Sequence, residues 1–246
     1  MKPREKLYRF HVENLRAIDR GLAAVLAPAR LAIAQRRDAL ATTYVCLYAL
    51  LMGAWAECRL LKLLYEPSAF SVPDRERILD ETSLDRWLLV VETAFRRHHN
   101  IPSAELKPPA LPATAFARME VLKNALSQDL QSVITLRNKL AHGQWKYPLN
   151  EDLDDIAQNQ MDALRKENIL SLKQKAALIE SICDSIHDLV VSRPTFDRDF
   201  DGHFRRVEQV RRNVSRKSYS LWTTQIQARY EQGRREMRRR LSEGGA

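Results

Sequence analysis

The feature that most constrains the fold is a long stripe of apolar residues with helical spacing between Thr114 and Gly143. Its members recur every three or four positions, which places them on one face of an α-helix. They are Phe116, Met119, Leu122, Leu126, Leu130, Val133, Leu136 and Leu140. The stripe predicts one long amphipathic helix, which ends at Gly143 because glycine commonly terminates helices.

Similar spacing elsewhere predicts further helices. We expect them over residues 3–38, 39–65, 75–98, 155–167 and 171–192. Pro28 is expected to bend or split the first helix, because proline removes a backbone hydrogen-bond donor. Residues 101–113 hold four prolines and indicate a loop, and residues 195–202 indicate a turn. Only seven glycines occur, and no run of alternating residues supports a sheet. The predicted fold class is therefore all-α, an up-and-down helical bundle with a long basic C-terminal helix.

The positive charge is concentrated near the C-terminus. The net charge of the chain is +9, and His203–Arg240 alone holds twelve Lys or Arg residues against three acidic ones. A basic excess confined to one segment indicates a polyanionic partner. We therefore divide the chain into a helical bundle, residues 1–195, and a basic helical extension, residues 196–246.

Within this extension we expect one helix from His203 to Leu241. Its two basic runs, RRVEQVRR and GRREMRRR, are candidates to bind the RNA backbone by charge, and the contacts are expected first from Arg205, Arg206, Arg211 and Arg212. Two other interpretations stay open. The helix is either solvated without a specific role, or it docks onto an acidic regulatory protein.

Composition argues against several other classes. The three cysteines lie far apart without a CxxC or Cys/His cluster, so we expect no disulfide framework, no metal and no cofactor, and a reduced cytoplasmic compartment. The charged N-terminus lacks the apolar core of a signal peptide. Between Asp38 and Glu57 lie 18 uncharged residues, long enough as a helix (~27 Å) to approach a bilayer's thickness. Because threonines, tyrosines and a glycine interrupt this stretch, we interpret it as a helix buried in the bundle and expect no membrane.

The segment Arg137–His142, RNKLAH, carries the residues best suited to catalysis. Arg137 and His142 are separated by four residues, Asn138 follows the arginine, and Gly143 follows the histidine. This tract resembles the active-site motif of HEPN ribonucleases, helical bundles that carry Arg-x4-His near the end of a helix. The resemblance is strong over Val133–Trp145 and rests elsewhere on helical architecture alone. It implies a bundle of the HEPN type.

Helix geometry sets conditions on this motif. Positions five apart are about 140° apart around a regular helix, so Arg137 and His142 share a face only if the helix ends or distorts at the histidine. Gly143 permits that. Asn138 and His142 are four apart and share a face, so we expect the Asn138 amide to orient the imidazole by a hydrogen bond.

These residue types suit metal-independent RNA cleavage. A histidine transfers protons near neutral pH, and a guanidinium binds phosphate oxygens and stabilises charge on a phosphorane. Attack by the 2′-hydroxyl would leave a 2′,3′-cyclic phosphate and a 5′-hydroxyl. The predicted catalytic residues are Arg137, Asn138 and His142, with Lys139 as a supporting residue. The alternative is a solvated arginine and a histidine that only complements the helix dipole.

Glu57 lies in the otherwise apolar segment WAECRLLK. A carboxylate at the edge of an apolar stripe is costly unless it is paired. Several HEPN groups place an acidic residue on a neighbouring helix near the motif, so Glu57 is a candidate to orient Arg137 or His142. A surface pair with Lys62 or Arg59 is the other interpretation.

The resemblance also implies an assembly and a role. HEPN sites are built from two motifs that meet across a dimer, so a homodimer with a composite active site is expected. The implied activity is an endoribonuclease acting as a toxin or antiphage effector on cellular RNA, under control of an antitoxin or regulatory protein. Gln144 stands where some HEPN toxins carry a nucleotidylated tyrosine, so that control is not expected. The alternative function is a non-catalytic HEPN module that binds RNA or a protein.

Overall fold

The computed structural model describes residues 4–67, 69–216 and 218–243, with no β-strand among them. The helices, in chain order, are α1 (Arg4–Ala34), α2 (Asp38–Tyr65), α3 (Val72–Leu79), α4 (Ser83–His99), α5 (Ala113–Ala125), the π-helical turn η1 (Leu126–Leu130), α6 (Gln131–Ala141), α7 (Gln158–Lys166), α8 (Ile169–Val191), α9 (Arg193–Arg216) and α10 (Tyr219–Glu243). The all-α prediction is confirmed.

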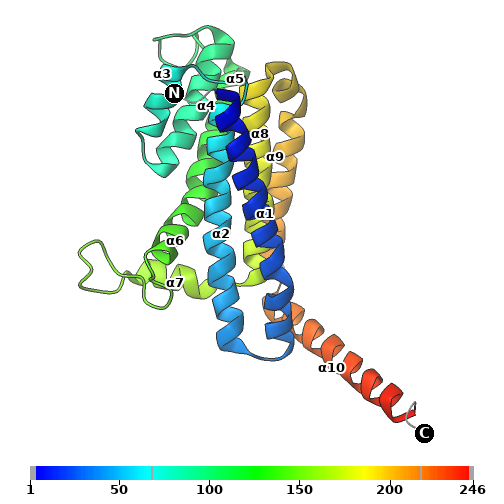
Figure 1. Ribbon diagram of the computed structural model, residues 1–246. Coiled ribbons are helices and arrows are strands. Elements are labelled where there is room, and N and C mark those ends of the chain that lie inside the picture. The colour runs from blue at the N-terminus through cyan, green and yellow to red at the C-terminus, as the bar shows by residue number, and fades with distance from the viewer. Residues whose placement is uncertain (1–3, 68, 217, 244–246) are drawn as a thin grey trace.

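Helix α2 lies at the centre of the bundle (Figure 1). It packs against α1, α6 and α8 and buries side chains along most of its length, among them Tyr48, Met52, Trp55 and Leu64. Among the described residues, α2 alone is long and apolar enough to cross a membrane. Its contacts with three other helices account for that composition, because a helix that is apolar on most sides must bury most sides.

Two predicted helices differ from the structure. The helix expected over residues 75–98 is two helices. A capping box formed by Ser71 and Asp74 starts α3, which ends at Leu79, and α4 begins separately at Ser83. The helix expected from Thr114 to Gly143 contains a π-helical turn at Leu126–Leu130. The apolar stripe continues through this turn, with Leu126 and Leu130 both buried. Pro28 lies inside a continuous α1, so the predicted split is wrong.

The C-terminal fifth of the chain also differs from the prediction. Residues 195–202 do not form a turn, because they lie within α9. Phe196, Phe200 and Val207 are buried in the main core, and α9 packs along α8. The first half of the predicted extension is therefore part of the bundle's packing.

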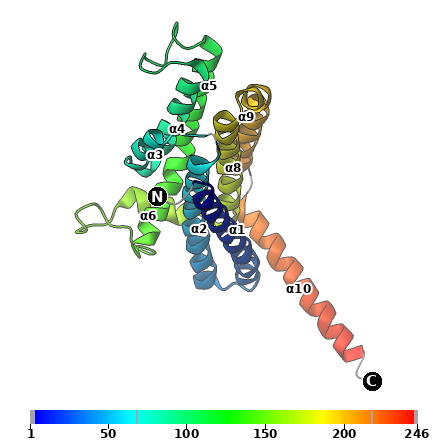
Figure 2. The ribbon, with the colours of Figure 1, turned by 45° about the horizontal axis from the view of Figure 1, so that its top comes forward.

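The basic segment is two helices, not one. Helix α9 ends at Arg216 and α10 begins at Tyr219. The first half of α10 contacts the end of α1 and the residue after it, where Gln227 Nε2 donates to the Ile33 carbonyl (3.3 Å) and Gln35 Nε2 donates to Tyr230 Oη (2.9 Å). Beyond those contacts α10 projects away from the other helices (Figures 1 and 2), and residues 231–242 are all exposed.

Candidate functional site

Helix α6 ends within the RNKLAH segment. Its last residue is Ala141, and Gly143 follows with a positive φ of 75°. The Gly143 amide donates to the Leu140 carbonyl (3.1 Å), and the Gln144 amide donates to the Lys139 carbonyl (3.0 Å). This pair of hydrogen bonds is the Schellman arrangement, which needs a left-handed residue at its turn. The predicted termination at Gly143 is confirmed.

Gly53 of α2 sets how closely α6 approaches. A Cβ atom built at position 53 would lie 2.4 Å from Cβ and 2.5 Å from Cγ of Arg137. Only glycine fits this contact without a shift of one helix. The stem of Arg137 therefore lies against the α2 backbone, which fixes where its guanidinium begins.

The Arg137 guanidinium is held by two partners. Its Nη2 lies 2.5 Å from Glu57 Oε2, and its Nη1 donates to Asn138 Oδ1 at 3.0 Å. Glu57 stands one helical turn after Gly53 on α2, so the close approach and the ion pair belong to the same contact. The Arg137 side chain is 29% exposed and that of Glu57 is 36% exposed, so both remain accessible to solvent.

Of the two interpretations of Glu57, the structure shows the contact with Arg137. The alternative partners are engaged elsewhere, since Arg59 pairs with Asp184 (2.5 Å) and Lys62 pairs with Glu66 (3.0 Å). A carboxylate at the edge of a buried helix is thereby matched with the motif arginine.

His142 is exposed at the end of α6. Its backbone has φ −88° and ψ 17°, outside the helical geometry, so the chain changes direction at this residue. The expected hydrogen bond between the Asn138 amide and the imidazole is absent from the described residues. Asn138 Oδ1 accepts from Arg137 instead, and only the backbone carbonyl of Asn138 contacts His142, as acceptor of its amide (3.2 Å). The structure thus brings Glu57, Arg137 and Asn138 together and leaves the His142 imidazole exposed, without a side-chain hydrogen bond among the described residues.

Lys139 points toward the segment that follows the motif. Its Nζ donates to the Leu149 carbonyl at 2.7 Å. Two further hydrogen bonds hold this segment, from Trp145 Nε1 to the Leu140 carbonyl (2.9 Å) and from the Leu149 amide to Gln144 Oε1 (2.9 Å). Lys139 therefore holds the chain that follows the motif against the end of α6.

The four arginines predicted to contact RNA differ in their surroundings. Arg205, Arg206 and Arg212 are exposed on α9. Arg211 is half-buried between Asp129 (2.5 Å) and Glu208 (2.7 Å), so its charge is already neutralised. The exposed arginines of α10 are Arg229, Arg234, Arg235, Arg238, Arg239 and Arg240. All of these except Arg229 belong to the GRREMRRR run, which the sequence already indicates as a candidate for RNA binding.

A metal centre finds no support in the described part of the chain, where no three His, Cys, Asp or Glu side chains cluster in a way that could hold an ion. Comparison with protein-family models, with curated proteins and with solved structures found no match.

Proposed function

We propose that this chain is a metal-independent endoribonuclease of the HEPN type, with Arg137 and His142 as its catalytic residues. The observation that carries the proposal is the geometry at the end of α6. An arginine is held by a carboxylate from the neighbouring helix, and an exposed histidine stands where the helix terminates. That arrangement places a restrained cation and an exposed imidazole five residues apart at the end of one helix.

Each group has a chemical task. The imidazole of His142 accepts the 2′-hydroxyl proton or delivers one to the leaving 5′-oxygen. The Arg137 guanidinium, held by Glu57 and Asn138, donates its remaining N–H groups to the phosphate oxygens as charge builds on them. Prior orientation by Glu57 lowers the entropy lost when the phosphate binds.

One exposed histidine per chain does not easily supply both the acid and the base. We therefore propose that two copies of the chain pair so that their α6 termini face one shared site. In this proposal the protein is cytoplasmic, acts as a toxin or antiphage effector, and is held inactive by an antitoxin or regulatory protein. The exposed arginines of α10 add an electrostatic surface for the RNA backbone.

A second candidate function is a non-catalytic module of the same type that binds RNA or a protein. The engagement of Arg137 favours it, because Glu57 already balances the guanidinium charge. In that case the RNKLAH segment would bind a phosphate or a partner without cleaving it.

The products of the reaction separate the two candidates. The purified protein should cut an RNA oligonucleotide in EDTA and leave a 2′,3′-cyclic phosphate and a 5′-hydroxyl, identified by mass spectrometry. The same oligonucleotide with 2′-O-methyl groups should remain intact, because the nucleophile is blocked. Products with a 5′-phosphate, or cutting of the blocked strand, would rule out the proposed mechanism.

A further inference from the structure

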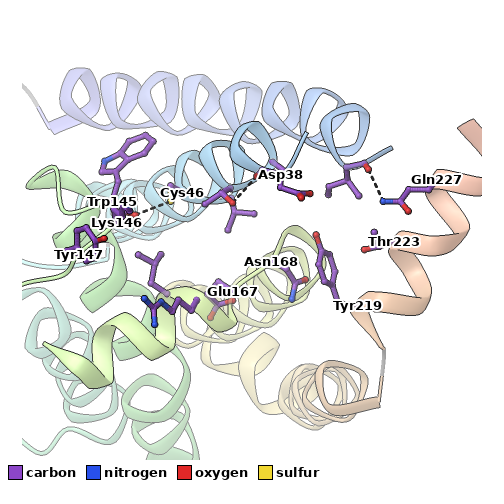
Figure 3. A pocket seen from close by; sticks show the side chains of 16 residues that line it. Asp38, Cys46, Trp145, Lys146, Tyr147, Glu167, Asn168, Tyr219, Thr223 and Gln227 are labelled. Atoms are coloured by element: carbon purple, nitrogen blue, oxygen red, sulfur yellow. Dashed lines mark hydrogen bonds between the residues drawn. The ribbon is translucent and has the colours of Figure 1, made fainter. Parts of the chain in front are cut away.

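A cavity of about 500 Å³ lies between the chain that follows the motif and helix α10. Figure 3 shows its walls, with Trp145–Tyr147 on one side, Tyr219 and Thr223 of α10 on the opposite side, and Asp38 at the start of α2 between them. Residues 164–168, from the end of α7 to the start of α8, close the remaining side. Its volume is within the range of pockets that bind small molecules.

The motif and the cavity are joined through a fixed segment. Trp145 is the second residue after Gly143, and its indole donates to the Leu140 carbonyl of α6. Cys46 of α2 donates its Sγ–H to the Trp145 carbonyl at 4.0 Å. A strand of RNA that reaches His142 therefore has this cavity as its neighbouring recess.

Two cations and one exposed aromatic ring line the cavity, with Lys146 and Tyr147 on the wall nearest the motif and Arg165 on the wall at the end of α7. Tyr147 is 48% exposed, although it is a large apolar ring. Lys146 Nζ lies 5.2 Å from the centroid of that ring. Lys146 and Arg165 line the cavity, are exposed, and have no carboxylate partner in the described chain. The lining also holds two carboxylates, Asp38 and Glu167, and Glu167 already pairs with Lys175. An exposed ring beside two cations that make no ion pair in the described chain matches a nucleobase joined to a phosphate.

The remaining walls carry hydrogen-bonding groups that their existing contacts leave partly unused. Asn168 Oδ1 accepts from the Leu170 and Ser171 amides, which leaves the Asn168 Nδ2 donors. Gln227 Nε2 donates to a carbonyl of α1, which leaves its Oε1 as an acceptor. Asp38 adds a carboxylate acceptor. A mixture of donors and acceptors suits the polar edge of a base, whereas a site for phosphate alone would be uniformly cationic.

We infer that this cavity binds one ribonucleotide unit next to the cleavage site, with its base against Tyr147 and its phosphate between Lys146 and Arg165. The inference rests on the proposed ribonuclease function. The unit belongs to the RNA substrate, so the cavity fixes the position of the strand relative to His142. A free nucleotide shares this chemistry, and the experiment separates the two sources.

The test measures binding without cleavage. Fluorescence anisotropy of a short labelled 2′-O-methyl RNA gives the affinity of the full chain, and calorimetry with each of the four ribonucleoside 5′-monophosphates gives that of free nucleotides. Tyr147→Ala should weaken RNA binding about 10-fold, the loss typical of one stacked base. Tyr147→Phe keeps the ring and should bind as the wild type does. The double variant Lys146→Ala/Arg165→Ala should also bind more weakly, while Arg20→Ala, which removes an exposed cation from α1, should not.

The outcomes are distinct. RNA binding that depends on Tyr147, with no measurable binding of monophosphates, supports a substrate subsite. Tight binding of a monophosphate that is lost in Tyr147→Ala supports the cavity but assigns it to a free nucleotide. If neither Tyr147→Ala nor the double variant Lys146→Ala/Arg165→Ala weakens RNA binding, the inference is overturned. Cleavage of unmodified RNA, measured alongside, tests the proposed function separately. If the wild type cleaves RNA but the cavity variants bind RNA as the wild type does, only the role of the cavity is refuted. If RNA binding depends on the cavity but no cleavage occurs, only the ribonuclease function is refuted.

Discussion

Gly53 of α2 and Arg137 of α6 are in backbone-to-stem contact, with a Cβ at position 53 falling 2.4 Å from the Cβ of Arg137. One helical turn later, Glu57 pairs with the same arginine. The position of the Arg137 guanidinium is thus set by a glycine and a carboxylate on one face of a central helix, not by the RNKLAH segment alone.

Gly53→Ala should therefore damage both the fold and the site. The added methyl forces α2 and α6 apart, which costs about 1–3 kcal/mol of unfolding free energy and moves Arg137 away from Glu57. Urea unfolding measures the first effect and RNA cleavage the second. Gly21→Ala is the matched control on α1, since its Cβ would meet only the Leu51 side chain, at ordinary contact distances of 3.5 Å to Cδ1 and 3.7 Å to Cδ2. That control should be neutral or stabilise the protein by up to about 1 kcal/mol. Equal behaviour of the two variants would contradict this role of Gly53.

Gly143→Ala isolates the backbone requirement at the motif. A Cβ at this position meets no atom within 4 Å, so the cost comes only from the positive φ of 75°. We expect a loss of about 1–2 kcal/mol in thermal unfolding, and a smaller loss for Gly143→Asn, because asparagine tolerates the left-handed region better. The control is Gly202→Ala within α9, where a Cβ also meets nothing and the φ is ordinary. A loss at Gly202 as large as at Gly143 would show that the turn is not the cause.

Glu57→Gln tests whether the ion pair serves activity or stability. The pair is partly exposed, so its removal should cost at most about 1 kcal/mol of stability. Cleavage should fall by at least ~10-fold, since an unrestrained guanidinium no longer meets the phosphate in a fixed orientation. Glu92→Gln is a matched control, because Glu92 pairs with Lys123 at 2.7 Å with similar exposure outside the site. If both variants cleave RNA at the wild-type rate, Glu57 has no positioning role.

The histidines that end α4 predict a dependence of stability on pH. Burial lowers the pKa of His98 below its ordinary value of 6.5, and burial also lowers that of His99. The unfolded chain then binds more protons than the folded chain around this value, so the unfolding free energy falls as pH decreases from about 7 to about 5. His98→Gln should make this fall shallower in urea unfolding at each pH. An unchanged slope would show that His98 does not contribute to it.

Much of the architecture follows from the sequence because it depends on local spacing. The apolar stripes located α1, α2, α8 and the long helix that carries the motif, and glycine chemistry located the turn at Gly143. The division at Ser83 and the helical state of residues 195–202 were missed. The helical state of residues 195–202 is decided by tertiary packing, since Phe196 and Phe200 bury against the bundle although Asp and Gly residues around them favour a turn.

The site shows the same division. Glu57 could be proposed as a partner of Arg137 because a charge within an apolar segment is conspicuous. The role of Gly53 could not be predicted, because the sequence of an apolar helix does not show whether a glycine faces solvent, the core or the backbone of another helix. Arg137 donates a hydrogen bond to the side-chain oxygen of Asn138, the group that was expected to bond to the His142 imidazole. Spacing along a helix does not show which of two neighbouring donors an amide oxygen will accept from.

The central claim is that Arg137 and His142 cleave RNA without a metal ion. The most direct measurement is the cleavage rate of one RNA in EDTA by the wild type, Arg137→Ala and His142→Ala, with His11→Ala as a control imidazole on α1. We expect His11→Ala to cleave RNA at the wild-type rate. The cleavage rate of Arg137→Ala and of His142→Ala should fall at least ~100-fold, within the range that acid–base catalysis contributes. Cleavage that requires magnesium, or that survives both substitutions in the motif, would contradict the account.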